Sequence, residues 1–195
     1  MDRDLIWSHI HEQRRALAAM LADLDEDEWS HPSLCAGWRV REVAAHVISS
    51  PAMTIGPMVT AVTGAGFRYN HMVDREARRR AQRPVADILA DYATYDGSRR
   101  RPPGTATLDP LIDVLVHTQD IAIPLGRHHA ASPEAAALAL PRARRVAWIF
   151  GTSGFVRRHR FEATDAEWSA GKGELVRGTA QDLLLTITGR RAVPT

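Results

Sequence analysis

Cysteine and lysine are nearly absent from the sequence, which has only Cys35 and Lys172. A single thiol excludes a disulfide framework, an iron–sulfur cluster and a four-cysteine zinc site within one chain. No apolar run reaches the roughly 18 residues of a transmembrane helix, and the polar start Met1–Asp4 lacks the apolar stretch of a signal peptide. We therefore expect a cytoplasmic protein that has no membrane partner.

Excess charge of one sign is also missing, because 25 lysines and arginines face 23 aspartates and glutamates, a formal net charge of +2. The basic run Arg75–Arg83 has no interleaved aromatic residues, so we interpret it as a solvated helix face and predict no nucleic-acid partner. The 195 residues are 45% hydrophobic and 25% charged, which is typical of one globular chain with its own core.

Helical periodicity dominates the first three-quarters of the chain. Apolar spacing predicts helices at residues 4–24, 39–49, 52–63, 85–95, 110–123 and 133–150, with a short acidic helical turn at 25–29. Asp109-Pro110 and Ser132-Pro133 each place a capping residue before a proline, which favours the start of a helix.

The last 40 or so residues have a different pattern. Phe161, Ala163 and Trp168 alternate with polar residues, which predicts two or three short strands. Thr179 is placed to cap a final helix over 180–188 that ends at Gly189. We predict a mainly α fold with a helical bundle over 1–155 and a strand-and-helix appendage over 156–195. The appendage should pack on the bundle, because so short a segment cannot form its own core.

The predicted helix at 110–123 is apolar nearly all round, as buried helices are, yet it carries Asp113, His117 and Asp120. At 100° per residue these three side chains project within a sector of about 60°. Buried ionisable groups need partners, and a metal ion held by an i, i+4 pair is one solution. A plain polar network between neighbouring helices is the alternative.

His46 is the natural third ligand, since it also lies on an apolar predicted helix. A lone histidine in such a helix is most often a core residue, but two histidines and one carboxylate suit zinc or another divalent transition metal. Three protein ligands leave a position open for water or substrate, as in catalytic sites. We predict metal binding by His46, Asp113 and His117, with Asp120 orienting a ligand without touching the metal.

Two motifs are similar to those of a known family. The segment Ser33–Val47 (SLCAGWRVREVAAHV) and the segment Asp113–Ile121 (DVLVHTQDI) resemble the mycothiol-dependent maleylpyruvate isomerase family of DinB/YfiT-like metalloproteins, and the tail Trp168–Arg190 resembles the ends of these proteins. The resemblance implies a DinB-like up-down four-helix bundle with one divalent metal. It places the ligands on His46, Asp113 and His117, the same three residues.

The sequence departs from that family at several points. Asp113 stands where the characterised isomerase has glutamate, Arg39 stands where relatives often have serine or threonine, and the C-terminal part is shorter. The family's reactive thiol belongs to mycothiol, so Cys35 is expected to be a small buried loop residue. No further catalytic side chain is assigned.

The resulting functional hypothesis is a metal-dependent, mycothiol-dependent isomerase or thiol S-transferase acting on a small, anionic electrophile. Zinc is the first choice of metal, with nickel, manganese or iron as alternatives. The predicted partners are the small-molecule thiol and the small-molecule substrate, and a homodimer is left open. The alternative function is a non-catalytic small-molecule binding or sensor protein on the same bundle.

Overall fold

A computed structural model describes residues 2–53 and 69–190 of the chain. The first segment contains α1 (Arg3–Ala22), α2 (Glu26–Ser30), α3 (Val40–Ser49) and a short 3₁₀ turn, η1 (Ser50–Ala52). The second segment contains α5 (Tyr69–Ala81), α6 (Val85–Thr94), α7 (Asp109–Ala122), α8 (Pro133–Arg145), α9 (Ser153–Arg158), β1 (His159–Ala163), β2 (Ser169–Gly171), β3 (Glu174–Gly178) and α10 (Ala180–Ile187). Of the helix predicted at 52–63, residues 54–63 lie outside the described residues.

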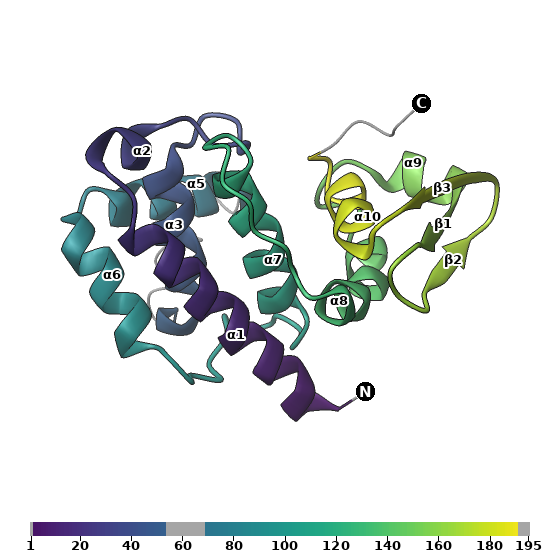
Figure 1. Cartoon of the computed structure of the whole chain (residues 1–195), viewed down its shortest axis with the longest axis horizontal. Helices are drawn as coiled ribbons and strands as arrows, with labels where there is room; N and C mark the ends of the chain where they lie inside the picture. Colours follow the sequence, from purple (N-terminus) through teal and green to yellow (C-terminus); the bar gives the residue numbers. More distant parts are fainter. Residues whose placement is uncertain (1, 54–68, 191–195) are drawn as a thin grey trace.

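Four helices, α1, α3, α6 and α7, pack around one core (Figure 1). Both α1 and α3 contact α6 on one side and α7 on the other. Their apolar faces bury Leu17, Val43, Ile88 and Val114 completely or almost so. Burial of these faces drives the helices together, as the apolar spacing in the sequence predicted.

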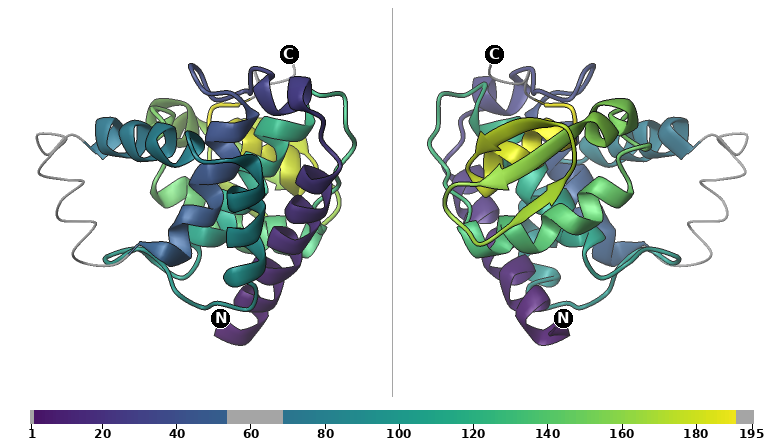
Figure 2. Two further views of the ribbon diagram at one scale, coloured as in Figure 1. Left: turned by 90° about the vertical axis from the view of Figure 1, so that its left-hand side faces the viewer. Right: turned by 90° about the vertical axis from the view of Figure 1, so that its right-hand side faces the viewer.

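The C-terminal residues form a small mixed sheet with strand order β2-β1-β3, covered by α10, which packs against α8 (Figure 2). β1 pairs antiparallel with β2 and parallel with β3, so Phe161 lies opposite Ala170 and Val176. Phe161 is fully buried in a cluster that also includes Leu111 of α7 and Leu184 of α10. The predicted class, mainly α with a small C-terminal strand-and-helix appendage, is confirmed, while the boundary at residue 155 stays a prediction.

Two details of the helix predictions were wrong. Asp109 is the first residue of α7 and not its cap, and its carboxylate accepts a hydrogen bond from the backbone N–H of Ala106 at 2.7 Å. The helix predicted over 133–150 ends at Arg145, because the carbonyl of Ala147 accepts from the N–H of Thr152 and Gly151 adopts a φ of 72°. The chain therefore turns at 146–150 instead of continuing as helix.

Candidate metal centre

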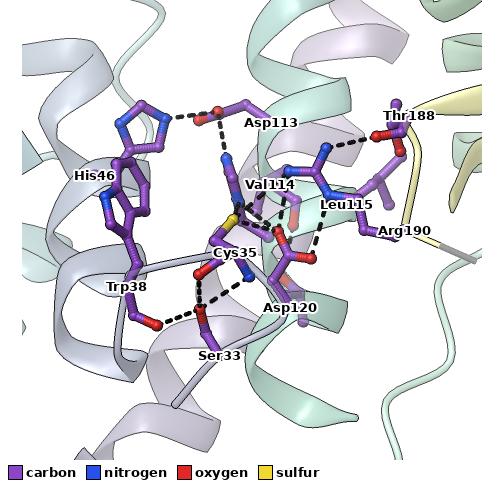
Figure 3. A network of polar contacts seen from close by, with 12 residues as sticks. Ser33, Cys35, Trp38, His46, Asp113, Val114, Leu115, Asp120, Thr188 and Arg190 are labelled. Carbon is purple, nitrogen blue, oxygen red and sulfur yellow. Dashed lines mark hydrogen bonds and ion pairs between the residues drawn. The ribbon is translucent and has the colours of Figure 1, made fainter. Parts of the chain in front are cut away.

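Helices α3 and α7 face each other at the centre of the bundle and bring three predicted ligands together, of which Figure 3 labels His46 and Asp113. Nε2 of His46 lies 3.2 Å from Oδ1 of Asp113, and Nε2 of His117 lies 3.4 Å from the same oxygen. One donor atom from each residue lies within 4.8 Å of the others. The convergence expected from the sequence is therefore present, although 67 residues separate His46 from Asp113.

The start of α3 is held by a carboxylate instead of a hydroxyl cap. The carboxylate of Glu42 accepts from the backbone N–H of Arg39 at 2.8 Å and from its guanidinium at 2.9 Å. Arg39 itself caps no N–H group with its side chain, as its departure from the family pattern predicted. Glu42 thus fixes the first turn of the helix that carries His46 one turn later.

Trp38 packs against both histidines from the loop before α3. Its ring centroid lies 5.3 Å from that of His46 and 6.4 Å from that of His117. The indole N–H donates to the carboxylate of Asp74 on α5 at 2.8 Å, so the ring is anchored on its far side. Sequence reasoning missed this residue, because an aromatic side chain in a loop gives no periodic signal.

Asp120 is a fully buried junction between three parts of the chain (Figure 3). Its Oδ2 lies 2.8 Å from Nδ1 of His117, accepts from the thiol of Cys35 at 3.0 Å and accepts from the guanidinium of Arg190 at 3.2 Å. A second guanidinium nitrogen of Arg190 donates to Oδ1 at 3.3 Å. Asp120 thereby links a predicted ligand to the loop before α3 and to the C-terminal residues.

The charges around this junction set its protonation. Burial alone would raise the pKa of Asp120, but the hydrogen bond from His117 and the charge of Arg190 lower it to about 2. Burial also raises the pKa of the Cys35 thiol, and the neighbouring Asp120 adds to the effect, giving about 12. Cys35 is therefore a neutral thiol that donates a hydrogen bond. It is only partly buried and lines the cavity, so the expectation of a buried loop residue was wrong in this respect.

Asp113 is ionised for a related reason. Burial would raise its pKa. The charge and hydrogen bond of His46, followed by the charge of His117, lower the pKa by more, so it stays below its ordinary value. Its side chain keeps 24% of its surface exposed. An ionised carboxylate between two imidazoles is a donor set that suits zinc and other divalent transition metals.

The three residues open onto a cavity of about 1080 Å³ between α3, α7, α8 and the C-terminal residues. Its walls include Trp38, Ile112, Arg142, Trp148 and Arg190. A cavity of this size can hold a drug-sized molecule. The wall residues on α8 and near the C-terminus could not be predicted from the sequence, because only tertiary packing brings them to α7.

The basic run behaves as a helix face. On α5, Arg78 pairs with Asp74, while Arg79 and Arg80 both pair with Glu76. Arg78 and Arg79 keep half or more of their side-chain surface exposed. Ion pairs within one helix neutralise much of the run, as expected of a solvated face.

Comparison with known proteins finds a family model that matches the N-terminal half of the chain. Residues 10–104 match the family model of the mycothiol maleylpyruvate isomerase N-terminal domain. This part of the chain is similar to that family. The resemblance inferred from the motifs is thereby confirmed, and the mycothiol maleylpyruvate isomerase N-terminal domain includes His46 but ends before Asp113 and His117. No curated protein matches the sequence.

Solved structures extend the likeness to the fold of nearly the whole chain. The crystal structure of the mycothiol-dependent maleylpyruvate isomerase aligns with a TM-score of 0.64 at 14% identity, covering 98% of this chain and 90% of that chain. A histidine-to-alanine mutant of that isomerase aligns with the same TM-score at 13% identity. At these identities the match establishes the fold, including the α7 half that the family model leaves out.

None of the described helices combines the length and the apolar character needed to cross a bilayer.

Proposed function

We propose that the protein binds one divalent metal and acts as a mycothiol-dependent isomerase or S-transferase on a small electrophile. The observation that carries the proposal is the convergence of His46, Asp113 and His117 beside a cavity of about 1080 Å³. The family match at residues 10–104 and the fold shared with the isomerase structure support mycothiol as the thiol.

The donor set fits a metal of this kind. Two imidazole nitrogens and one carboxylate oxygen are available within 4.8 Å of one another. This combination suits zinc first, and nickel, manganese or iron as alternatives. When bound, such a metal supplies Lewis acidity and lowers the pKa of a coordinated thiol.

The chain's own residues prepare the ligands. The ionised Asp120 accepts a hydrogen bond from Nδ1 of His117, so the imidazole proton sits there and the lone pair of Nε2 faces Asp113. The exchange of the family's glutamate for Asp113 shortens this ligand by one methylene group. We expect the exchange to favour a metal held closer to α7.

Cys35 supplies no nucleophile in this proposal. Its thiol stays protonated and is held by Asp120, so the reacting sulfur must come from a small-molecule thiol. Trp38 covers one side of the two histidines and restricts the access of water from that side.

Turnover by the reconstituted protein tests the proposal. Metal-free protein is loaded separately with zinc, nickel, manganese and iron and supplied with mycothiol and maleylpyruvate, and separately with mycothiol and an aryl halide. The proposal expects metal-dependent and mycothiol-dependent turnover of at least one of these, lost in His117→Ala. Saturable mycothiol binding without any turnover would contradict the enzyme and favour the small-molecule binding or sensor protein.

A further inference from the structure

The walls of the cavity beside the metal centre are mostly apolar. Its large apolar lining side chains include Trp38, Ile112, Val116, Trp148, Ile149 and Phe150. Trp148 is 71% exposed and Ile149 is 37% exposed, on the turn that follows α8. Apolar surface of this size gains most when a ligand removes it from water, and tryptophan offers the largest such surface.

The arginine side chains that line the cavity are already paired with carboxylates. Among the described residues that line it, the arginines are Arg142 and Arg190. Arg142 donates to both oxygens of Asp109 at 2.6 and 3.0 Å, and Arg190 donates to both oxygens of Asp120. Each guanidinium is therefore already neutralised by a carboxylate in a bidentate pair.

A further carboxylate lines the cavity outside the predicted metal ligands. Asp74 accepts hydrogen bonds there from the indole N–H of Trp38 and from the guanidinium of Arg78. A dicarboxylate entering the cavity would have to give up water to reach guanidinium groups whose charge is already balanced. The desolvation of its two charges would then be poorly compensated.

From these two observations we propose that the cavity accepts an uncharged electrophile with an apolar, ring-sized body. The body packs on Trp148 and Ile149, and the reactive carbon faces the metal centre. This substrate class replaces the anionic substrate expected from the sequence, and it rests on the proposed function for its chemistry. With an aryl chloride, the thiol sulfur forms a bond to the ring carbon, the carbon–chlorine bond breaks, chloride leaves with the electron pair, and the thiol proton passes to solvent.

A binding experiment tests the substrate class without requiring turnover. Titration calorimetry compares an uncharged aromatic, 4-nitrobenzyl alcohol, with the dianion maleate, on the purified protein with and without zinc. We expect saturable binding of the aromatic and about tenfold weaker binding to Trp148→Ala, with Trp148→Phe retaining most of the affinity. Because Trp148 is largely exposed, both variants should keep the wild-type circular dichroism spectrum.

A matched control comes from Leu175, which is 49% exposed on β3 and does not line the cavity. Leu175→Ala should bind the aromatic as the wild type does. The proposal is overturned if 4-nitrobenzyl alcohol shows no saturable binding, if maleate binds more tightly, or if Trp148→Ala binds the aromatic unchanged.

Turnover provides a second readout for the same variants. With mycothiol, the KM for 1-chloro-2,4-dinitrobenzene should rise about tenfold in Trp148→Ala while kcat changes little, and an unchanged KM contradicts the role of Trp148. Failure of the proposed function would appear as an absence of metal-dependent turnover, while the calorimetric comparison would still decide between an apolar and an anionic ligand.

Discussion

Replacing Asp120 with asparagine tests the buried junction that orients His117. Asparagine keeps the size of the side chain but removes the charge that Arg190 and the imidazole face. Breaking a buried ion pair by removing one partner typically costs about 3–5 kcal/mol, and Arg190 is only 16% exposed, so we expect a loss of about 3 kcal/mol at pH 7.

The loss should depend on pH in a defined direction. The pKa of Asp120 falls from an ordinary 3.8 to about 2 on folding, so its ionisation stabilises the fold above pH 4 by about 2 kcal/mol. That contribution declines as the pH falls through the folded pKa. Between pH 6 and pH 3 the stability difference between wild type and Asp120→Asn should therefore shrink by about 1 kcal/mol.

Urea unfolding with a chelator present, at several pH values, measures this difference free of metal. The exposed Asp27 provides the control, because Asp27→Asn should leave the difference near zero at every pH. A stability difference for Asp120→Asn that stays constant from pH 6 to pH 3 would refute the ionised, hydrogen-bonded state assigned to this carboxylate.

Three further predictions concern the loop thiol and the C-terminal appendage. Alkylation of Cys35 by iodoacetamide at pH 8 should be far slower than that of an ordinary thiol, because a pKa of about 12 leaves about a thousandfold less thiolate, and an ordinary rate would contradict the neutral thiol. Phe161→Ala should lower the free energy of unfolding by about 3–5 kcal/mol in urea titrations, since Phe161 is fully buried, and a loss below about 1 kcal/mol would mean that the appendage does not share the core. Thr179→Ala should cost about 1 kcal/mol by removing the hydroxyl that accepts from the N–H of Asp182, whereas Thr179→Ser should restore it.

The convergence of the three predicted ligands was predictable because the signal for each residue is local. An apolar helix that carries Asp113 and His117 one turn apart, and a second that carries His46, each conflict with the cost of burying charge. A pattern with the helical period therefore predicts that each helix is buried, and it also identifies the ionisable residues that stand on the buried helix. The same periodicity predicted the bundle helices α1, α3, α6 and α7. The cap at Thr179 and the stop at Gly189 predicted the last helix, α10.

The remaining parts of the site depend on long-range packing. Arg190 follows a helix that packs against α8, and only this packing brings its guanidinium to Asp120, 70 residues earlier in the chain. The end of α8 was missed because residues 146–150 are apolar enough to continue it. The hydroxyl of Thr152 instead donates to the carbonyl of Ile187 at 2.6 Å and ties the turn to the end of α10. That turn carries Trp148 to the cavity.

Metal content tests the central claim most directly. Wild type, His117→Ala and a control, His128→Ala at an exposed loop position, are reconstituted with zinc and analysed by mass spectrometry beside circular dichroism. We predict one metal per chain in wild type and in His128→Ala, and loss of most metal in His117→Ala with its helical spectrum retained, because the chain has its own apolar core and does not need the ion to fold. A wild type that stays metal-free after reconstitution with zinc, nickel, manganese and iron would contradict the account.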